Sequence, residues 1–304
     1  MIETFARALP NGTTLSCRAA GAPGRPLMMF LHGFPEAAFI WDELLAYFAA
    51  PEHGGFRCVA PNLRGFEKSS APSEVSAYRA HLLVQDIAEL AASENPAGRI
   101  EVLVAHDWGG AFGWGYGNRH ADRLGRLVIL NSPHPGTFAR ELQNSAEQRA
   151  ASAYMNFLAR PDAEALLAAD DYRRMWPFFL GMKAGPEGFG WLTEKVKDQY
   201  RDVWDAGLTG ACNLYRVTPL KPPMPGQPTP AMPDLPHDNL TVAVPTMVLW
   251  ALDDKALLPG LLEGLEDYVP KLEIVKVPGA THWMVHERPA FVASEIESFL
   301  ERTR

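Results

Sequence analysis

The chain has 304 residues, of which 47 % are hydrophobic and 21 % are charged, so disorder, coiled coil and collagen are excluded for most of its length. Its formal net charge is −8, which argues against nucleic acid or an anionic membrane as the main partner because no basic surplus is available to pair with phosphate. Three widely spaced cysteines without a metal-binding pattern predict reduced thiols in a cytoplasmic protein. We find no signal-peptide pattern at the start and no apolar run long enough for a membrane span.

Short apolar runs alternate with helical patterns in the first 135 residues and again near the end, which predicts parallel strands joined by helices. The predicted strands are 27–31, 57–60, 101–105, 127–130, 246–250 and 272–277. The predicted helices between them are 78–93, 109–119, 260–268 and 289–300. Five glycines in 109–119 lower helix stability and indicate close packing of that helix on the sheet.

The middle of the chain has a different pattern, with predicted helices at 138–160, 163–169, 171–180 and 192–204. A proline-rich stretch follows at 218–236 and predicts a loop, because neither a strand nor a helix tolerates that density of proline. We therefore predict an α/β fold with a mostly parallel, doubly wound sheet. Its core comprises 1–135 and 237–304, and a helical cap with its return loop occupies 136–236.

The third predicted strand ends in Ala-His-Asp-Trp-Gly at 105–109. Small residues on both sides of Asp107 are typical of a nucleophile elbow, a sharp turn that exposes the central side chain at the top of a sheet. The same turn aims the backbone N–H of Trp108 at the space beside that side chain. An aspartate that caps a helix after a strand is the alternative interpretation.

A turn with the sequence His-Gly-Phe-Pro at 32–35 follows the first apolar strand. It can bring the N–H of Phe34 beside that of Trp108, and two N–H groups that converge on one point form an oxyanion hole. A plain turn is the alternative, and the bond from Phe34 to Pro35 is a candidate cis peptide.

Asp254 and His282 each follow a late predicted strand. A carboxylate at such a position can orient a histidine that acts as a base. A single histidine is more often structural, but the chain order of nucleophile, acid and histidine matches the order found in α/β-hydrolases.

Taken together, these segments resemble the epoxide hydrolase family of α/β-hydrolases over nearly the whole chain. The matching pieces are His-Gly-Phe-Pro-Glu at 32–36, Asn-Leu-Arg-Gly-Phe at 62–66, His-Asp-Trp-Gly-Gly at 106–110, Asp254 and His-Trp at 282–283. Counting from Trp250, Asp254 matches the family's acid better than Asp253. The Asp-Trp pair also occurs in haloalkane dehalogenases, so it does not separate the two families.

Two cap tyrosines distinguish the epoxide hydrolases in this resemblance. Tyr154 stands seven residues before Pro161, and Tyr215 lies in an Asn-Leu-Tyr-Arg stretch, as the family pattern requires. Each tyrosine alone is better explained by packing, whereas the pair in both matching stretches favours a role at the epoxide oxygen. A phenol can donate a hydrogen bond to that oxygen while uncharged at neutral pH.

The resemblance implies that Asp107 attacks an epoxide carbon to form an ester, which water activated by His282 then hydrolyses to a vicinal diol. Asp254 would orient His282, and Glu36 and His106 resemble residues that organise water. The implied partners are a small uncharged, apolar epoxide and water, without a cofactor or metal. Met155, Phe157 and the cap tryptophans are expected to line an apolar pocket, and a homodimer is a possible assembly.

Two other functions remain open at this point. A haloalkane dehalogenase would use the same Asp107 and His282, with a halide donor from Trp176, Trp191 or Trp204, because Phe34 stands where that family typically has asparagine. Fluoroacetate dehalogenases carry arginines just after the nucleophile, and this chain does not. A non-catalytic ligand-binding protein on a hydrolase scaffold is the alternative of another class.

Overall fold

A computed structural model describes residues 1–182, 190–224, 226–228 and 235–304. Its described part contains one eight-stranded sheet in the order β1-β2-β4-β3-β5-β6-β7-β8. Strands β3 to β8 pair in parallel, whereas β1 and β2 are antiparallel to their neighbours. The strands are β1 Glu3–Ala8, β2 Thr14–Ala20, β3 Leu27–Leu31, β4 Arg57–Pro61, β5 Ile100–His106, β6 Leu124–Leu130, β7 Thr246–Ala251 and β8 Leu272–Val277.

The prediction of a mostly parallel α/β sheet is confirmed, and each predicted strand is present within a few residues of its expected ends. Strands β3, β4 and β7 are buried along their whole length, which explains their mostly apolar sequences. The sequence analysis did not predict β1 and β2. These strands lie at one edge of the sheet. In β1, Glu3, Thr4, Ala6 and Ala8 are exposed, so no apolar run marks this strand.

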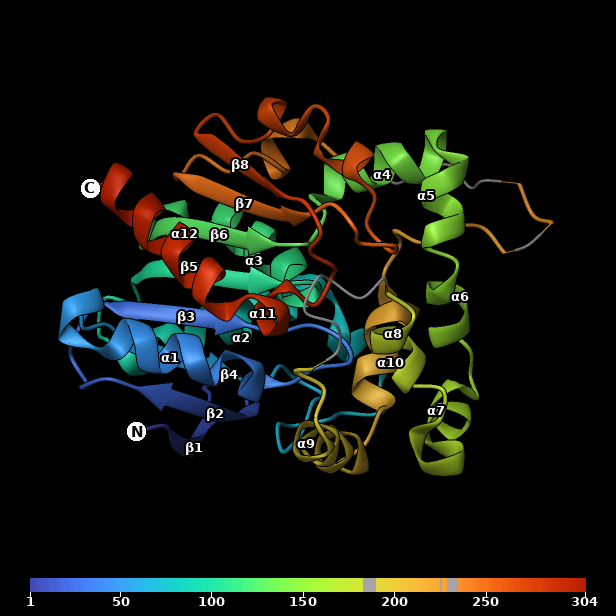
Figure 1. Ribbon diagram of the computed structural model, residues 1–304, viewed down its shortest axis with the longest axis horizontal. Helices are drawn as coiled ribbons and strands as arrows, with labels where there is room; N and C mark the ends of the chain where they lie inside the picture. The colour runs from blue at the N-terminus through green and yellow to red at the C-terminus, as the bar shows by residue number, and fades with distance from the viewer. Residues whose placement is uncertain (183–189, 225, 229–234) are drawn as a thin grey trace.

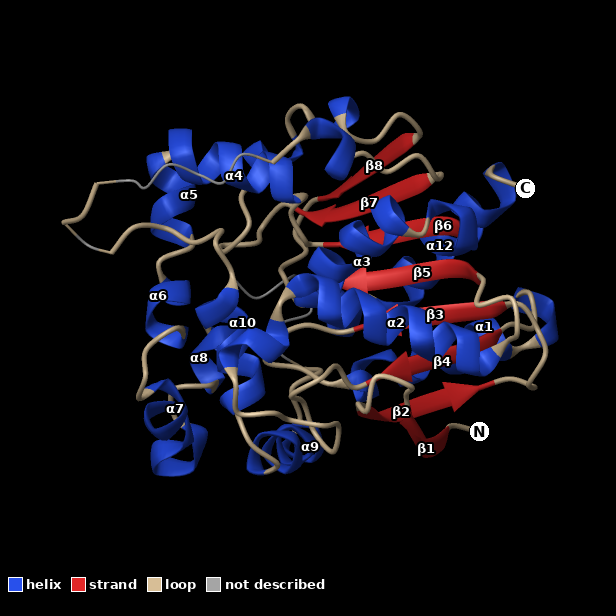
Figure 2. Ribbon diagram, turned by 180° about the vertical axis from the view of Figure 1, so that it is seen from behind, coloured by secondary structure: helices blue, strands red, loops and turns tan. Residues whose placement is uncertain are grey.

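Helices cover both faces of the sheet (Figures 1 and 2). Met28 and Phe30 of β3 face a layer with α1, α11 and α12, while Met29 and Leu31 face the layer with α2 and α3. This alternation follows from the two-residue period of a strand. The helices of these layers are α1 Asp42–Ala49, α2 Ala80–Glu94, α3 Trp108–Arg119, α11 Met284–Glu287 and α12 Pro289–Arg302.

Helix α3 packs as closely on the sheet as its glycines predict. A side-chain carbon at Gly110 would lie 2.3 Å from the Cβ of Ser132, and one at Gly113 would lie 3.1 Å from the Cβ of Ala105. Larger residues would push the helix away from β5 and β6. Because Asp107 immediately precedes α3, this close contact fixes the position of the turn that holds Asp107.

Helices α4 to α10 lie between β6 and β7 in the chain and beyond the carboxyl ends of the strands, on the right in Figure 1. They are α4 Pro135–Asn144, α5 Ala146–Ala151, α6 Tyr154–Leu158, α7 Ala163–Tyr172, α8 Trp176–Leu180, α9 Glu194–Asp205 and α10 Thr209–Val217. We call this group the cap. The exact domain boundaries at residues 136 and 236 stay a prediction.

The predicted boundaries of three helices were wrong. The predicted helix 138–160 is interrupted at Ser145, which has extended backbone and caps α5, and again near Ser152. The predicted helix 171–180 begins only at Trp176, because residues 170–172 have positive φ angles. The predicted helix 260–268 is two 3-10 turns: the first ends at Glu263, which has extended backbone, and Gly264, with a φ of 68°, precedes the second.

Short 3-10 helices complete the connections: η1 Ala38–Trp41, η2 Pro51–His53, η3 Val75–Tyr78, η4 Ala121–Arg123, η5 His237–Asn239, η6 Pro259–Leu262 and η7 Leu265–Asp267. Within the proline-rich stretch, residues 218–224, 226–228, 235 and 236 form neither helix nor strand, as predicted. Residues 225 and 229–234 of that stretch lie outside the described residues. No helix in the described part of the chain is long and apolar enough to cross a membrane. Cys17, Cys58 and Cys212 are buried and unpaired.

Candidate active site

Asp107 occupies a strained turn between β5 and α3. Its φ of 51° and ψ of −123° are angles that a residue other than glycine rarely adopts. Two glycines make room for it. A side-chain carbon at Gly33 would lie 2.2 Å from Oδ1 of Asp107, and one at Gly109 would lie 2.4 Å from the carbonyl oxygen of Leu31. The turn therefore has the geometry of a nucleophile elbow.

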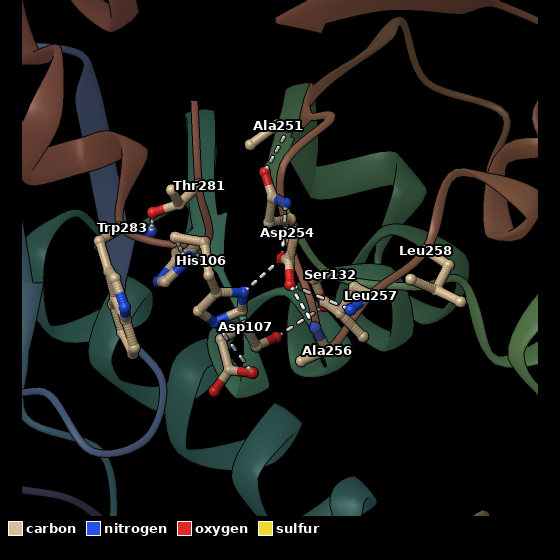
Figure 3. Close-up of polar contacts among 12 residues, drawn as sticks. His106, Asp107, Ser132, Ala251, Asp254, Ala256, Leu257, Leu258, Thr281 and Trp283 are labelled. Atoms are coloured by element: carbon tan, nitrogen blue, oxygen red, sulfur yellow. Dashed lines mark hydrogen bonds and ion pairs between the residues drawn. The ribbon is translucent and has the colours of Figure 1, made fainter. Parts of the chain in front are cut away.

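The two carboxylate oxygens of Asp107 have different surroundings. Oδ1 accepts a hydrogen bond from the Phe34 N–H at 2.8 Å, and Oδ2 lies 3.7 Å from Nε2 of His282. The carbonyl oxygen of Asp107 accepts from the Ser132 hydroxyl at 2.6 Å (Figure 3). Trp108 begins α3, so its N–H belongs to the first turn and has no acceptor within the helix. The cis peptide between Phe34 and Pro35 shapes this loop.

Asp254 and His282 form a buried pair at the carboxyl edge of the sheet. Nδ1 of His282 lies 2.6 Å from Oδ2 of Asp254. Oδ1 of Asp254 accepts from the N–H groups of Ala256 at 2.8 Å and Leu257 at 3.0 Å (Figure 3). Burial acts to raise the pKa of Asp254, but His282 and these N–H groups outweigh it and hold the pKa below its usual value. Asp254 is thus a buried carboxylate bonded to the imidazole.

The His282 imidazole lies among negative charges. Burial acts to lower its pKa, but Asp254 first and then Asp107 outweigh burial and raise the pKa to about 9. His282 is consequently protonated at neutral pH. Nδ1–H then donates to Asp254, and Nε2–H points to the carboxylate of Asp107.

Asn131 is a site residue that sequence reasoning missed. It follows β6 with a φ of 38°, and its Nδ2 donates to Oδ2 of Asp254 at 2.8 Å. Its Oδ1 accepts from the Ala251 N–H at 2.9 Å, so the side chain connects the end of β6 to the end of β7 and, through Asp254, to the loop that follows β7. The available signal was an asparagine directly after a buried strand, since asparagine tolerates a positive φ.

Tyr154 and Tyr215 of the cap face the same cavity as Asp107 and His282. Their ring centroids are 6.1 Å apart, and Tyr215 also contacts the ring of Phe34 edge-on. Burial, above all other causes, raises the pKa of each phenol, so both remain protonated donors. The cavity has a volume of about 220 Å³ and is lined by Phe34, Asp107, Ala151, Tyr154, Pro177, Phe178, Gly181, Met182, Tyr215, Lys255, Ala256, His282 and Trp283.

Glu36 and His106 lie together behind His282 and are not among the described residues that line the cavity. Nδ1 of His106 is 3.1 Å from Oε2 of Glu36, and Nε2 of His106 donates to the His282 carbonyl at 2.9 Å. Glu36 also contacts His286 and Tyr200, two residues that sequence reasoning did not identify. The role of Glu36 and His106 in organising water stays a prediction.

The prediction of which residues form the apolar wall of the cavity was wrong, because none of the expected residues is among the described residues that line it. Met155 is buried in the hydrophobic core, and Phe157 lies at an outer hollow beside Phe178. The cap tryptophans are engaged elsewhere. The Trp204 N–H donates to the Pro35 carbonyl at 2.8 Å, and the Trp176 N–H donates to the carbonyl of Asp171 at 3.3 Å.

The third cap tryptophan, Trp191, stacks on His286, with ring centroids 4.3 Å apart. Like the other two cap tryptophans, it is not among the described residues lining the cavity. None of the three therefore presents its N–H to Asp107 as a halide donor would. This arrangement disfavours the dehalogenase alternative.

Comparison with known proteins agrees with this geometry. Residues 26–289 match the family model for the alpha/beta hydrolase fold. Epoxide hydrolase 3 of Xenopus tropicalis is 30 % identical over 304 residues, which cover 98 % of this chain and 77 % of that protein.

The chain belongs to the epoxide hydrolase family. Among solved structures of this family, one described as a novel epoxide hydrolase from metagenomes of hot environments is 36 % identical, with a TM-score of 0.83 and 99 % of each chain covered. The epoxide hydrolase of Bacillus megaterium in complex with an inhibitor has the same TM-score at 27 % identity, with 98 % of this chain and 100 % of that chain covered. The family model includes every site residue considered above.

Proposed function

We propose that this protein hydrolyses an uncharged epoxide to a vicinal diol through an ester on Asp107. The observation that carries the proposal is that Asp107, His282 and the phenols of Tyr154 and Tyr215 share one largely apolar cavity. An epoxide needs a nucleophile on its carbon and a hydrogen-bond donor on its oxygen at the same time. The cavity supplies both from opposite sides, since Asp107 comes from the core and the tyrosines come from the cap.

In the first half-reaction, Oδ2 of Asp107 attacks an epoxide carbon and the ring C–O bond breaks. Oδ2 is suited to this role because Oδ1 is held by the Phe34 N–H. The departing oxygen takes a proton from the phenol of Tyr154 or Tyr215, and the remaining phenol donates a hydrogen bond to it. The product is an ester between Asp107 and the substrate, which is covalent catalysis by a carboxylate.

In the second half-reaction, His282 removes a proton from water, and the resulting hydroxide attacks Cγ of Asp107. Esterification has removed the negative charge of Asp107, which was one cause of the raised pKa of His282. The pKa of His282 therefore falls on the intermediate, and the imidazole releases its resting proton to solvent to become the neutral base that this step needs. Asp254 holds the imidazole in place through Nδ1.

The tetrahedral intermediate places its negative charge on Oδ1. The Phe34 N–H already donates to this atom at 2.8 Å, and the Trp108 N–H at the start of α3 is the proposed second donor. Collapse breaks the bond from Cγ to Oδ2, and protonated His282 gives its proton to the leaving oxygen. The water oxygen stays on Asp107, whose carboxyl proton returns through solvent to the tyrosinate.

Product analysis with purified protein tests this proposal against its alternatives. With styrene oxide and related apolar epoxides we expect diol, and with haloalkanes of similar size we expect no halide. Release of halide without diol would instead identify a dehalogenase. Thermal stabilisation by these compounds without either product would indicate a binding protein, and both outcomes contradict the proposal.

A further inference from the structure

One face of cap helix α9 is bonded to the loop that carries the Phe34 N–H. The hydroxyl of Tyr200 donates to Oε1 of Glu36 at 3.1 Å, and the N–H of Trp204 donates to the Pro35 carbonyl at 2.8 Å. Tyr200 and Trp204 are four residues apart, so they lie on the same side of the helix. Both are almost completely buried. The cap is thus hydrogen-bonded to the core directly behind the catalytic cavity.

Glu36 is a fully buried carboxylate, with 0 % of its surface exposed. His286 lies 2.7 Å from Oε1 through its Nε2, and His106 lies 3.1 Å from Oε2 through its Nδ1. Burial acts to raise the pKa of Glu36, but its bonds to His106 and His286 outweigh burial and lower it. A buried charge of this kind is costly unless its partners are all present. Tyr200 and His286 together satisfy Oε1.

His106 links Glu36 to the proposed base. The His282 carbonyl can only accept a hydrogen bond, so Nε2 of His106, at 2.9 Å, carries a proton and donates it. The rings of His106 and His282 are also in contact, with centroids 4.7 Å apart. His282 is therefore held at two points, at its imidazole by Asp254 and at its main chain by His106.

We propose that Tyr200 and His286 are positioning residues for the hydrolytic half-reaction. By anchoring Oε1 of Glu36, they fix His106, and His106 in turn fixes the backbone of His282. Because Tyr200 belongs to α9, the base is correctly placed only when the cap is seated on the core. This inference rests on the proposed function, since it concerns the step in which His282 activates water.

Removal of the Tyr200 hydroxyl should slow ester decay more than ester formation. Ester formation depends on Asp107 and the cap phenols, and the Trp204 bond to Pro35 still holds the loop when the Tyr200 hydroxyl is removed. Tyr200→Phe keeps the ring contacts with Phe39 and Trp204. We expect ester decay to slow by about 3- to 10-fold, the range for one lost hydrogen bond, while ester formation changes less than about twofold.

Rapid-quench mass spectrometry of single turnovers with styrene oxide measures both rates. Tyr172→Phe is a matched control, because its hydroxyl bonds Asp205 at the end of α9 without touching Glu36. Both of its rates should equal those of the wild type. Wild-type protein that forms no ester contradicts the proposed function itself. Normal ester decay in Tyr200→Phe, with an active wild type, contradicts only this inference.

A double-mutant cycle with Glu36→Gln distinguishes positioning from a general loss of packing. If Tyr200 acts through Glu36, Tyr200→Phe should have no further effect on ester decay in the Glu36→Gln background. Effects that multiply in the double variant would overturn the inference. Should Tyr200→Phe fail to fold, His286→Ala provides the same test, since it should slow ester decay while His286→Gln, which restores a donor, recovers it.

Discussion

Phe34 and Asp107 are 73 positions apart in the chain, yet the N–H of the first donates to Oδ1 of the second at 2.8 Å. The bond forms because β3 and β5 are parallel neighbours and the loops at their carboxyl ends meet. Gly33 permits the approach, as any side chain there would collide with the carboxylate. In the proposed mechanism, this bonded oxygen of Asp107 becomes the oxyanion, and the other oxygen attacks the epoxide.

The cap phenols provide a first prediction. Tyr154→Phe and Tyr215→Phe should each slow ester formation by roughly 10- to 150-fold, because a hydrogen bond to a developing charge contributes about 1.5–3 kcal/mol. The double variant should form no measurable ester, since the alkoxide would lack any donor in a buried cavity. Single-turnover mass spectrometry with an apolar epoxide measures this step.

Melting curves control for folding in these variants, because phenylalanine retains the ring and its contacts with Phe34 and Phe178. Ester formation by the folded double variant at the wild-type rate would show that the tyrosines only pack. The proposal that the cap phenols donate to the epoxide oxygen would then be contradicted.

The pH dependence of ester decay is a second prediction. His282 must be neutral to accept a proton from water, so ester decay should rise with pH and level off above the pKa of His282 on the intermediate. That pKa should lie below the value of about 9 in the resting protein, because esterification removes the charge of Asp107. Quenched-flow measurement of ester decay between about pH 5 and pH 9 gives the profile.

His282→Gln is the control for this profile. It should retain the ester at every pH, visible as a mass increase equal to the substrate, because forming the ester requires no base. Multiple turnovers by this variant at the wild-type rate would remove His282 from its proposed role. A flat profile in the wild type would do the same.

Asn131 gives a third prediction, which concerns both stability and rate. Asn131→Ala removes the donor to Asp254 and the acceptor for the Ala251 N–H, both buried. We expect a loss of about 1–3 kcal/mol in the free energy of unfolding, measured with urea, and slower ester decay because Asp254 is less firmly held.

Asn118→Ala is the matched control for Asn131→Ala. The Asn118 amide bonds the backbone carbonyls of Asp238 and Thr241, away from the cavity. Its loss should lower stability without changing ester decay. If Asn131→Ala behaved in the same way, its role would be confined to stability.

The sequence predicted those elements of the fold whose own residues form a recognisable pattern. Buried parallel strands need uninterrupted apolar residues, so β3 and β7 were evident, and their carboxyl ends necessarily carry Phe34 and Asp254 to one edge. The exposed edge strand β1 has no such pattern. In the cap, helix ends depend on single residues such as Ser145, whose side chain accepts from the Gln148 N–H and begins a new helix.

Sequence reasoning missed three residues near the site for a different reason. Asn131, Tyr200 and His286 have hydrogen-bond partners far away in the chain. Apart from the position of Asn131 directly after a buried strand, nothing local distinguishes them from packing residues. Similarly, the cap tryptophans were expected at the cavity because aromatic residues often line apolar pockets. Tertiary contacts instead determine where these side chains lie, as the hydrogen bond from the Trp204 N–H to the Pro35 carbonyl illustrates.

The origin of the oxygen in the product tests the central claim most directly. The proposed mechanism transfers Oδ2 of Asp107 to the diol and leaves the water oxygen on the carboxylate. In a single turnover with excess enzyme in water enriched in oxygen-18, the diol should therefore be unlabelled and Asp107 should carry the label, both measured by mass spectrometry. A fully labelled diol in that first turnover, with unlabelled Asp107, would mean direct attack by water and would contradict the covalent ester.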